Sequence, residues 1–302
     1  MSTGAARPRL GLRDWPGVFK ETGKRFLADD CMGLSQQIAY SCLLAFFPAM
    51  VFLIAMLSLI GAFGSLQSFL EPVAPESVTG IIRQLQRDSG GGGSVVAALI
   101  GGFLALWVAS GAVNSVVKAV NRAYGEDETR PFWKVRLLSL LLVCASSLVL
   151  AAMLLLIVLG GKVGDAIAAR ADLGSAFTWF WDLFRWPLAF VAVLLLFALI
   201  YHVAPSGEGR GWKWHTPGAL VGGLLWLGLS GLFALYTAFT SSYSRTYGSL
   251  AAGIILLLWL NFSAWAVLFG AELNAELDRR AGVRAAGGPG AGLVRPARRA
   301  GA

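Results

Sequence analysis

Long runs of apolar residues, interrupted only by small polar ones, dominate the chain. Six of these runs approach or exceed the roughly 20 residues that a helix needs to cross the roughly 30 Å hydrocarbon core of a bilayer. A water-soluble helix would instead alternate apolar and polar positions. Lipid offers the backbone no hydrogen bonds, so each run must be helical. The predicted membrane-spanning helices cover residues 38–63, 95–117, 137–159, 186–203, 217–239 and 249–270.

Two further helices are predicted outside these spans. Asp14-Trp15-Pro16 is typical of a helix start, with Asp14 as N-cap and Pro16 in the first turn. The apolar positions that follow predict a short interfacial helix, although a solvated helix packed on cytoplasmic loops fits the same pattern. Between spans one and two, apolar positions from Val78 to Leu85 recur at i, i+3, i+4 and i+7. This spacing predicts an amphipathic helix outside the membrane.

The two ends of the chain differ from its apolar middle. Residues 1–14 and 281–302 are basic and rich in alanine, glycine and arginine. Such compositions bury too little apolar surface to fold, so we expect a flexible basic N-terminus and a disordered basic tail. Residues 15–280 then form a single six-helix membrane domain.

Composition and charge fix the orientation. Of the 302 residues, 56% are hydrophobic and 14% are charged. The segments on the side of the N-terminus hold 19 of the 25 lysines and arginines, and the opposite loops hold 6. The positive-inside rule places the N-terminus in the cytoplasm, and an even number of spans returns the C-terminus there. The predicted fold class is therefore an all-α integral membrane protein with six transmembrane helices and both termini inside.

The basic face also indicates the partners. The net charge of +8 falls entirely on the cytoplasmic side. Anionic headgroups of membrane lipids are sufficient partners for such a surface, so nucleic acid is not expected.

Catalytic and metal-binding patterns are missing from the sequence. The three cysteines show no CxxC spacing, and the chain has two histidines and no HExxH, GxSxG or phosphate-binding loop. We therefore expect no enzymatic activity, no metal and no cofactor.

Three groups of polar residues in or beside the spans are candidates for a substrate pathway, because polar groups in lipid are costly. The first enters span one and consists of Gln37, Tyr40 and Ser41, followed by Pro48. Gln37, Tyr40 and Ser41 lie on one helical face, and Pro48 should kink the span. They predict a polar vestibule at the cytoplasmic mouth. Interhelical hydrogen bonds with a static kink are the alternative.

The second group leaves span two. Asn114, Lys118, Asn121 and Arg122 follow at i, i+4, i+7 and i+8, which predicts one polar stripe. Lys118 and Arg122 could hold a phosphate or carboxylate headgroup. Ordinary extension of long basic side chains to the interface is the alternative.

The third group closes span six. Asn261 lies near the middle of the span, and Glu272 and Asn274 lie at its cytoplasmic end. Ion pairs along the helix are a sufficient explanation for Glu272. If Glu272 is instead buried against Lys118, it is a candidate gate or proton carrier. That pairing rests on shared depth alone.

Small residues predict where helices approach closely. Gly218 and Gly222 form a GxxxG pattern at the start of span five. Such a face allows close contact within one chain or between chains, so it is also consistent with a homo-oligomer.

Several motifs, in this order, resemble the YihY/BrkB family of bacterial inner-membrane proteins, also described as virulence factor BrkB. They are Ala39-Tyr40-Ser41 with Phe46-Phe47-Pro48, Asn121-Arg122-Ala123-Tyr124, Arg130-Pro131-Phe132-Trp133-Lys134, Pro217-Gly218-Ala219, Tyr247-Gly248-Ser249-Leu250 with Trp259, and Gly270-Ala271-Glu272-Leu273-Asn274. The resemblance covers about residues 20–280, while the two ends and the glycines at 90–93 depart from it.

The resemblance implies a six-helix fold in the bacterial inner membrane but no single activity. Family members have carried a ribonuclease BN label and a virulence-factor label. A metal-dependent nuclease needs a cluster of His and Asp ligands in an aqueous domain, which this sequence does not offer.

Two functions are carried forward from the sequence. The first is a transporter or flippase of an amphiphilic or anionic envelope molecule, a lipid or a solute, which the stripe near span two and the basic inner face favour. The second is a non-enzymatic envelope scaffold or regulatory membrane protein, which the outer amphipathic helix and the GxxxG face favour. An ion channel is disfavoured, since the spans carry no ring of charges.

Overall fold

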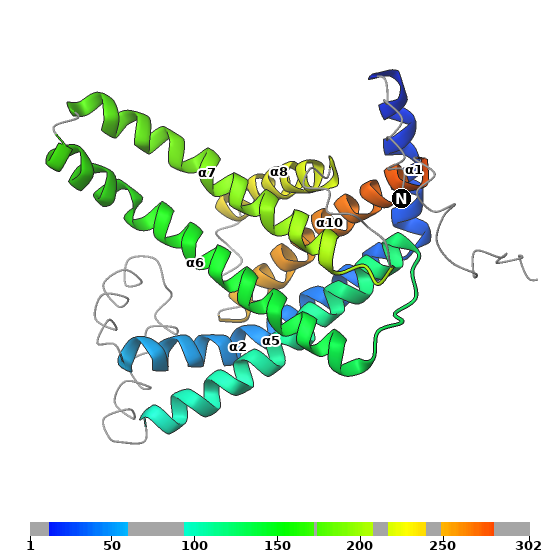
Figure 1. Cartoon of the computed structure of the whole chain (residues 1–302), viewed down its shortest axis with the longest axis horizontal. Helices are drawn as coiled ribbons and strands as arrows, with labels where there is room; N and C mark the ends of the chain where they lie inside the picture. Colours follow the sequence, from blue (N-terminus) through cyan, green and yellow to red (C-terminus); the bar gives the residue numbers. More distant parts are fainter. Residues whose placement is uncertain (1–11, 60–93, 172–173, 208–216, 240–248, 281–302) are drawn as a thin grey trace, which may run out of the picture.

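The computed structural model describes residues 12–59, 94–171, 174–207, 217–239 and 249–280, and all regular structure in these ranges is helical (Figure 1). The expected outer helix at 78–85, the glycine link at 90–93, residues 1–11 of the N-terminus and the tail at 281–302 lie outside the described residues. The helices are α1 (Trp15–Ala28), α2 (Cys31–Leu59), α5 (Ser94–Tyr124), α6 (Phe132–Ala171), α7 (Gly174–Val203), α8 (Pro217–Phe239) and α10 (Ser249–Arg280), preceded by a 3-10 turn, η1 (Leu12–Asp14).

Five helical segments are long and apolar enough to cross a membrane. They are Ile100–Tyr124, Phe132–Leu150, Phe177–Val203, Pro217–Thr237 and Gly253–Arg280. The remaining predicted span corresponds to α2, whose 29 residues exceed the length that a span needs. The all-helical membrane fold is confirmed, and the count of six spans with both termini inside stays a prediction.

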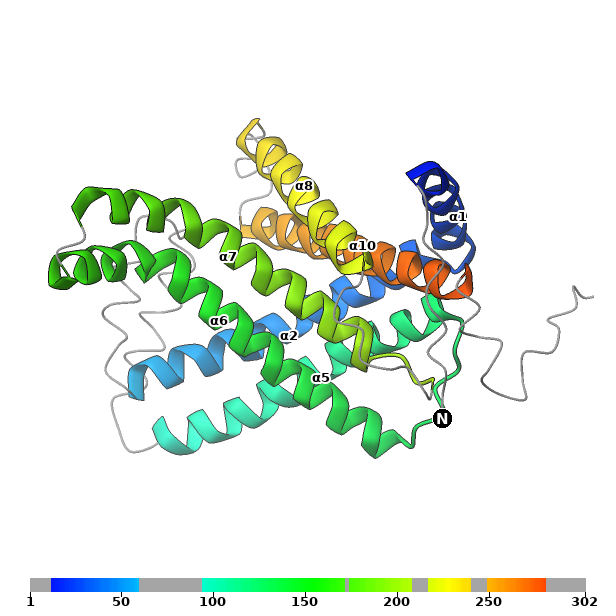
Figure 2. The ribbon, with the colours of Figure 1, turned by 45° about the horizontal axis from the view of Figure 1, so that its top comes forward.

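The helices run further than the apolar runs that predicted them. α6 has 40 residues and α7 has 30, which correspond to roughly 60 Å and 45 Å at 1.5 Å per residue. Together they form a long antiparallel hairpin (Figures 1 and 2). The aromatic segment before the predicted fourth span is part of α7, and Trp179 and Trp186 are exposed. The apolar run marks only the part that must face lipid, while the helix continues into more polar turns.

α10 lies at the centre of the fold. It packs against α8, α2, α1 and α5, and Figures 1 and 2 show it between α8 and α2. Residues 271–277 are all buried, so this last part of α10 is enclosed on every side. The most enclosed part of the described chain is therefore the cytoplasmic end predicted for span six.

The predicted GxxxG contact is formed within the chain, between α8 and α10. A Cβ atom placed on Gly222 would lie 2.9 Å from the carbonyl oxygen of Ala266. One placed on Gly218 would overlap the carbonyl oxygen of Gly270. Further along the same contact, Trp226 Nε1 donates to Ser263 Oγ at 3.1 Å. Close approach of two backbones explains why these positions hold glycine.

The N-terminal helix is also confirmed. Pro16 occupies the first turn of α1, while the side chain of Asp14 caps none of its N–H groups. Val18 is fully buried against Leu273 and Leu277 of α10, whereas Leu27 is exposed. α1 therefore buries one face on the protein, and its contact with the membrane interface stays a prediction.

Candidate functional site

The C-terminal half of α5 carries most of the predicted polar stripe. Lys118 and Arg122 are exposed, and Arg122 Nε lies 3.8 Å from the carboxylate of Asp29. Asn114 is half-buried, and its Oδ1 atom has no hydrogen-bond partner among the described residues. Spacing at i, i+4 and i+8 puts the three side chains on one face. A helix suited to cross the membrane thus carries two exposed cations in line with an amide whose oxygen is buried and unpaired among the described residues.

Asn121, the fourth residue of the predicted stripe, is buried, unlike Lys118 and Arg122. Its side chain is 3% exposed. Its Nδ2 donates to Glu128 Oε2 at 2.9 Å, and its Oδ1 accepts from the backbone N–H of Ser206 at 2.8 Å. Buried amides are normally satisfied in this way. Asn121 therefore joins the end of α5 to the segment after α7.

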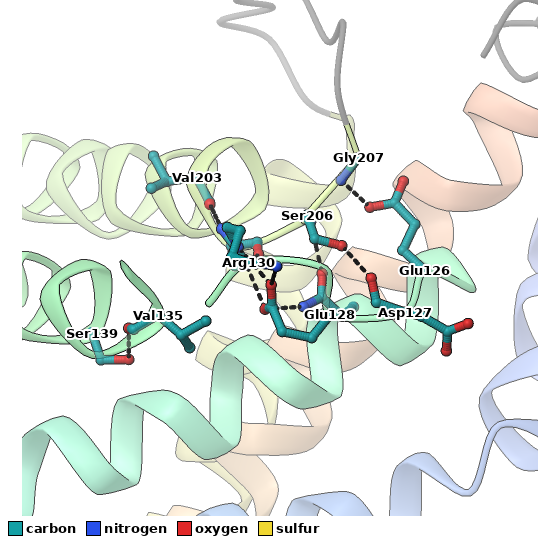
Figure 3. Close-up of polar contacts among 11 residues, drawn as sticks. Glu126, Asp127, Glu128, Arg130, Val135, Ser139, Val203, Ser206 and Gly207 are labelled. Carbon is teal, nitrogen blue, oxygen red and sulfur yellow. Dashed lines mark hydrogen bonds and ion pairs between the residues drawn. The ribbon is translucent and has the colours of Figure 1, made fainter. Parts of the chain in front are cut away.

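Arg130 holds the loop between α5 and α6 against the end of α7 (Figure 3). Its guanidinium donates to the carbonyl oxygens of Val203 at 3.3 Å and Ala204 at 2.7 Å. Carbonyls at a helix end have no partner within the helix. The same guanidinium makes two 2.7 Å hydrogen bonds to the carboxylate of Glu128. These bonds and the charge of Arg130 hold the pKa of Glu128 below its usual value.

The segment after α7 is tied to the same loop by its own polar groups (Figure 3). Ser206 Oγ donates to the carbonyl oxygen of Asp127 at 2.8 Å, and the N–H of Gly207 donates to Glu126 Oε2 at 2.7 Å. Together with Asn121, Glu128 and Arg130, these contacts form the loop clamp, a cross-link between the C-terminal ends of α5 and α7.

The candidates on α2 are divided between two environments. Gln37 and Tyr40 are exposed, while Ser41 Oγ lies 3.3 Å from Ser115 Oγ of α5. Pro48 lies inside α2, which continues as a helix beyond it. The interhelical hydrogen bond expected as one alternative is therefore present at Ser41, while Gln37 and Tyr40 remain on the surface.

Three candidate residues, Ser41 on α2, Asn114 on α5 and Asn261 on α10, lie at about the same height along the helix bundle. Cys31 contacts Glu272, which fixes the register of α2 against α10. Ser41 lies ten residues along α2 from that contact, and Asn261 lies eleven residues back along α10, which is roughly 15 Å in both cases. The contact of Ser41 with α5 brings Asn114 to the same level. The Oδ1 atoms of Asn114 and Asn261 are both buried without a partner among the described residues.

Glu272 lies in a sealed ionic cluster. It is fully buried. Cys31 Sγ donates to its Oε1 at 3.7 Å, and Arg279 Nη2 lies 3.7 Å from its Oε2. One turn further on, Glu276 pairs with Arg279 at 3.3 Å and with Arg25 of α1 at 3.3 Å. The helical ion pairs predicted for this end of α10 are therefore confirmed.

The pair of Lys118 with Glu272, considered from shared depth, is not formed. Lys118 is exposed on α5, whereas Glu272 is enclosed by α2 and by its own helix. Asn274 faces α8 instead, where its Oδ1 accepts from the N–H of Gly218 at 3.0 Å. The end of α10 thus has one face toward α8 and another toward α1 and α2.

The described part of the chain offers no group of three His, Cys, Asp or Glu side chains that could hold a metal ion. Of the two histidines, His202 lies in α7 and His215 lies outside the described residues.

Sequence reasoning missed two arginines that the structure makes prominent. Arg130 was quoted only within a motif, and Arg136 only within a count of positive charges. Arg136 lies over the indole ring of Trp107 with its Cζ 3.9 Å from the ring centroid. An arginine directly at the start of an apolar run is a signal that the sequence does contain.

Comparison with known proteins connects this architecture to bacterial membrane proteins. The family described as virulence factor BrkB matches residues 22–292. The ribonuclease-like protein YfkH of Bacillus subtilis is 30% identical over 86% of this chain and 95% of its own. A UPF0761 membrane protein of Alteromonas mediterranea is 30% identical over 88% of each chain. A UPF0761 membrane protein of Aromatoleum aromaticum is 28% identical, and the chain spans 61% of its length. No solved structure gives a significant match.

These relatives and the five apolar helices fit a multi-pass protein of the bacterial inner membrane. The word ribonuclease belongs to the name of one relative and carries no residue assignment to this chain.

Proposed function

The chain belongs to the virulence factor BrkB family, as its motifs predicted, and we propose that it is a transporter or flippase of an anionic amphiphile of the bacterial envelope. The observation that carries the proposal is one face of α5, on which the exposed Lys118 and Arg122 lie in line with the half-buried Asn114. No bond-breaking step is part of this function.

The energetic argument starts from the cost of these groups in lipid. A cation near the middle of a bilayer costs several kcal/mol unless it reaches water or a partner. Arg122 lies near the end of α5 and pairs with Asp29. Lys118 lies about 6 Å further in, and Asn114 about 12 Å, at 1.5 Å per residue. The headgroup of an anionic amphiphile offers Lys118 an opposite charge while its apolar part stays in lipid.

α2 forms one border of this face. Ser41 and Ser115 hold α2 against α5, and Tyr40 of α2 is 59% exposed. An exposed phenol on this neighbouring helix offers a hydroxyl donor to a headgroup and an apolar ring to a hydrocarbon tail. The face therefore combines charge, hydrogen bonding and apolar contact, as an amphiphile requires.

The scaffold alternative has lost one of its two supports. The glycine face of α8, offered to a partner in that hypothesis, is occupied by α10 of the same chain. The outer amphipathic helix lies outside the described residues. Transport is therefore the function that the described residues favour.

The test measures transbilayer movement of a headgroup-labelled anionic lipid. Purified protein is reconstituted into phosphatidylcholine vesicles containing fluorescent phosphatidylglycerol, and dithionite added outside destroys the label in the outer leaflet. Wild type should expose label from the inner leaflet, and Lys118→Ala should slow that exposure by about tenfold, the equivalent of about 1.4 kcal/mol.

Lys20→Ala is the matched control, because Lys20 is an exposed lysine of α1 outside the stripe. Native mass spectrometry of the same proteins reports whether a bound anionic lipid disappears only with Lys118. Wild-type vesicles that behave like protein-free ones, with or without a proton gradient, would count against transport. A protein partner retained in all samples would then favour the scaffold.

A further inference from the structure

A second cationic position lies deeper along α5, where α6 crosses it (Figures 1 and 2). Arg136, in the second turn of α6, donates from Nη2 to the carbonyl oxygen of Trp107 at 2.8 Å. Its guanidinium also stacks on the Trp107 ring, with 3.9 Å between Cζ and the ring centroid. The indole is 49% exposed. A guanidinium is thus held in a fixed orientation at the surface of the bundle.

The depth of this contact makes it costly. Trp107 lies seven residues inside the segment Ile100–Tyr124, which is suited to cross the membrane. Trp107 is fifteen residues from Arg122 at the cytoplasmic end, roughly 22 Å along the helix. An arginine side chain that reaches this part of α5 is costly unless it meets water, a counter-ion or lipid headgroups pulled toward it into the membrane.

No protein counter-ion is found among the described residues. The ion pairs of the described part of the chain include none with Arg136. The carbonyl of Trp107 takes one of five N–H donors. Lys134, two residues before Arg136 in the sequence, is also a cation, but its ammonium group lies 5.4 Å over the ring of Trp133. The site is therefore positive and has donors left for an anion.

The surface around the site is apolar and open. Phe103, Leu137 and Leu141 are exposed at 66%, 52% and 60%. Phe103 lies one turn from Trp107 on α5, and Leu137 follows Arg136 on α6. An anion bound here lies next to an apolar surface that can contact acyl chains. The site therefore suits an amphiphile better than a free ion.

We propose that Arg136 and Trp107 form a binding site for the phosphate of an anionic glycerophospholipid, whose acyl chains lie on the exposed aromatic and leucine side chains beside it. A planar guanidinium group can donate two parallel hydrogen bonds to two oxygens of one phosphate. A carboxylate of another protein chain would also meet this charge, and it becomes one outcome of the test.

This site names the substrate class of the proposed function as a phospholipid. Its role in transport rests on that proposed function. Trp107, Asn114 and Lys118 are spaced at i, i+7 and i+11, which places them on one face of α5. Trp107 lies roughly 16 Å along α5 from Lys118, and Arg136 reaches it from the second turn of α6. A headgroup that follows this face of α5 therefore meets Lys118 and Arg136 in turn.

The experiment places a photoreactive benzoylphenylalanine at Phe103, beside the site, in the full chain. The protein is reconstituted in phosphatidylcholine vesicles that contain radiolabelled phosphatidylglycerol or, in a parallel sample, radiolabelled diacylglycerol. We expect crosslinking to phosphatidylglycerol and little to diacylglycerol. Arg136→Gln should lower the phosphatidylglycerol crosslink about tenfold, as loss of a charge-assisted hydrogen bond requires. Arg136→Lys, which keeps the charge but loses the planar group, should retain an intermediate signal.

Arg185→Gln is the matched control, since Arg185 lies on α7 and pairs with Asp182 at 3.2 Å; it should leave the crosslink unchanged. Equal crosslinking of the two lipids, a comparable loss in Arg185→Gln or no loss in Arg136→Gln would overturn the site. Displacement of the lipid by added inorganic phosphate would show that the site binds a free anion instead. A crosslink to a second protein chain would show that it binds a carboxylate of a partner protein. The lipid comparison uses the native arginine, so it remains decisive if Arg136→Gln fails to fold.

The outcomes separate this inference from the proposed function. An Arg136-dependent phosphatidylglycerol crosslink without dithionite-detected movement keeps the site and removes transport. Movement that depends on Lys118 while the crosslink ignores Arg136 keeps transport and removes the site.

Discussion

The contact between α8 and α10 gives the most quantitative prediction, because two glycines of α8 differ sharply in what an added methyl group would meet. A Cβ atom at Gly218 would overlap the carbonyl oxygen of Gly270 and lie 2.6 Å from the Asn274 side chain. A Cβ atom at Gly228 would meet nothing within 4 Å. Gly218→Ala and Gly228→Ala are therefore the same chemical change in one helix, with and without a steric conflict.

The magnitudes follow from the geometry. Overpacking against a backbone carbonyl costs about 1–3 kcal/mol, since the carbonyl cannot rotate away as a side chain would. The same shift strains the hydrogen bond from the Gly218 N–H to Asn274 Oδ1, which contributes about 1 kcal/mol more. We expect Gly218→Ala to lower the free energy of unfolding by about 2–4 kcal/mol. Gly228→Ala should raise it by up to about 1 kcal/mol, because alanine is the better helix former.

The assay is unfolding by sodium dodecyl sulfate in mixed micelles, followed by tryptophan fluorescence, with both variants and wild type at the same micelle composition. The two variants should move the midpoint in opposite directions. Equal midpoints for Gly218→Ala and Gly228→Ala would refute the close backbone contact and, with it, the packing of α8 on α10.

Three further predictions concern the cytoplasmic ends of the helices. Arg130→Gln removes both the capping of α7 and the partner of Glu128, so it should destabilise the protein by about 1.5–3 kcal/mol in the same assay, whereas Lys20→Gln should not. The pKa of Glu128 is lowered from its usual 4.5 in the folded state, so its contribution to stability is full above about pH 4.5 and is lost as the pH falls through the folded pKa. That acid-dependent part should vanish in Glu128→Gln, and an unchanged pH profile would contradict the clamp. Arg280 joins α1 to α10 through the Gly17 carbonyl at 3.1 Å and Glu276 at 2.7 Å; Arg280→Gln should speed chymotryptic cleavage within α1 severalfold, and an unchanged rate would show that apolar packing alone holds α1.

The membrane fold could be predicted because its signal is strong and local. Twenty apolar residues in a row have few alternatives to a membrane-spanning helix. The ends of the helices could not be predicted in the same way. α6 continues from Phe132 to Ala171, although its apolar run suggested 137–159. Whether a helix stops where its apolar run stops depends on contacts beyond the membrane, which a hydropathy pattern does not contain.

Candidate residues were harder to place, since a helical face can be read from spacing while its surroundings cannot. Asn121 and Lys118 both fit one stripe by spacing, yet Asn121 turns toward the loop clamp and Lys118 stays exposed. Glu272 and Lys118 were paired on an expected shared depth alone, yet Glu272 contacts Cys31 of α2 while Lys118 is exposed on α5. The rotation of each helix about its own axis decides these contacts, and it is set by packing among several helices at once.

The distribution of close contacts also indicates where movement in transport is least costly. α8 and α10 touch through their backbones at Gly218 and Gly222, and a shift there breaks many contacts together. The clamp around Arg130 joins α5 to the end of α7 at the cytoplasmic side only. Further along α5, Arg136 of α6 donates a hydrogen bond to the carbonyl oxygen of Trp107. A headgroup that competes for Arg136 would loosen this crossing while the α8–α10 pair stays fixed. Introducing a disulfide between α8 and α10 should therefore leave lipid movement intact, whereas one between α5 and α6 near Trp107 should stop it.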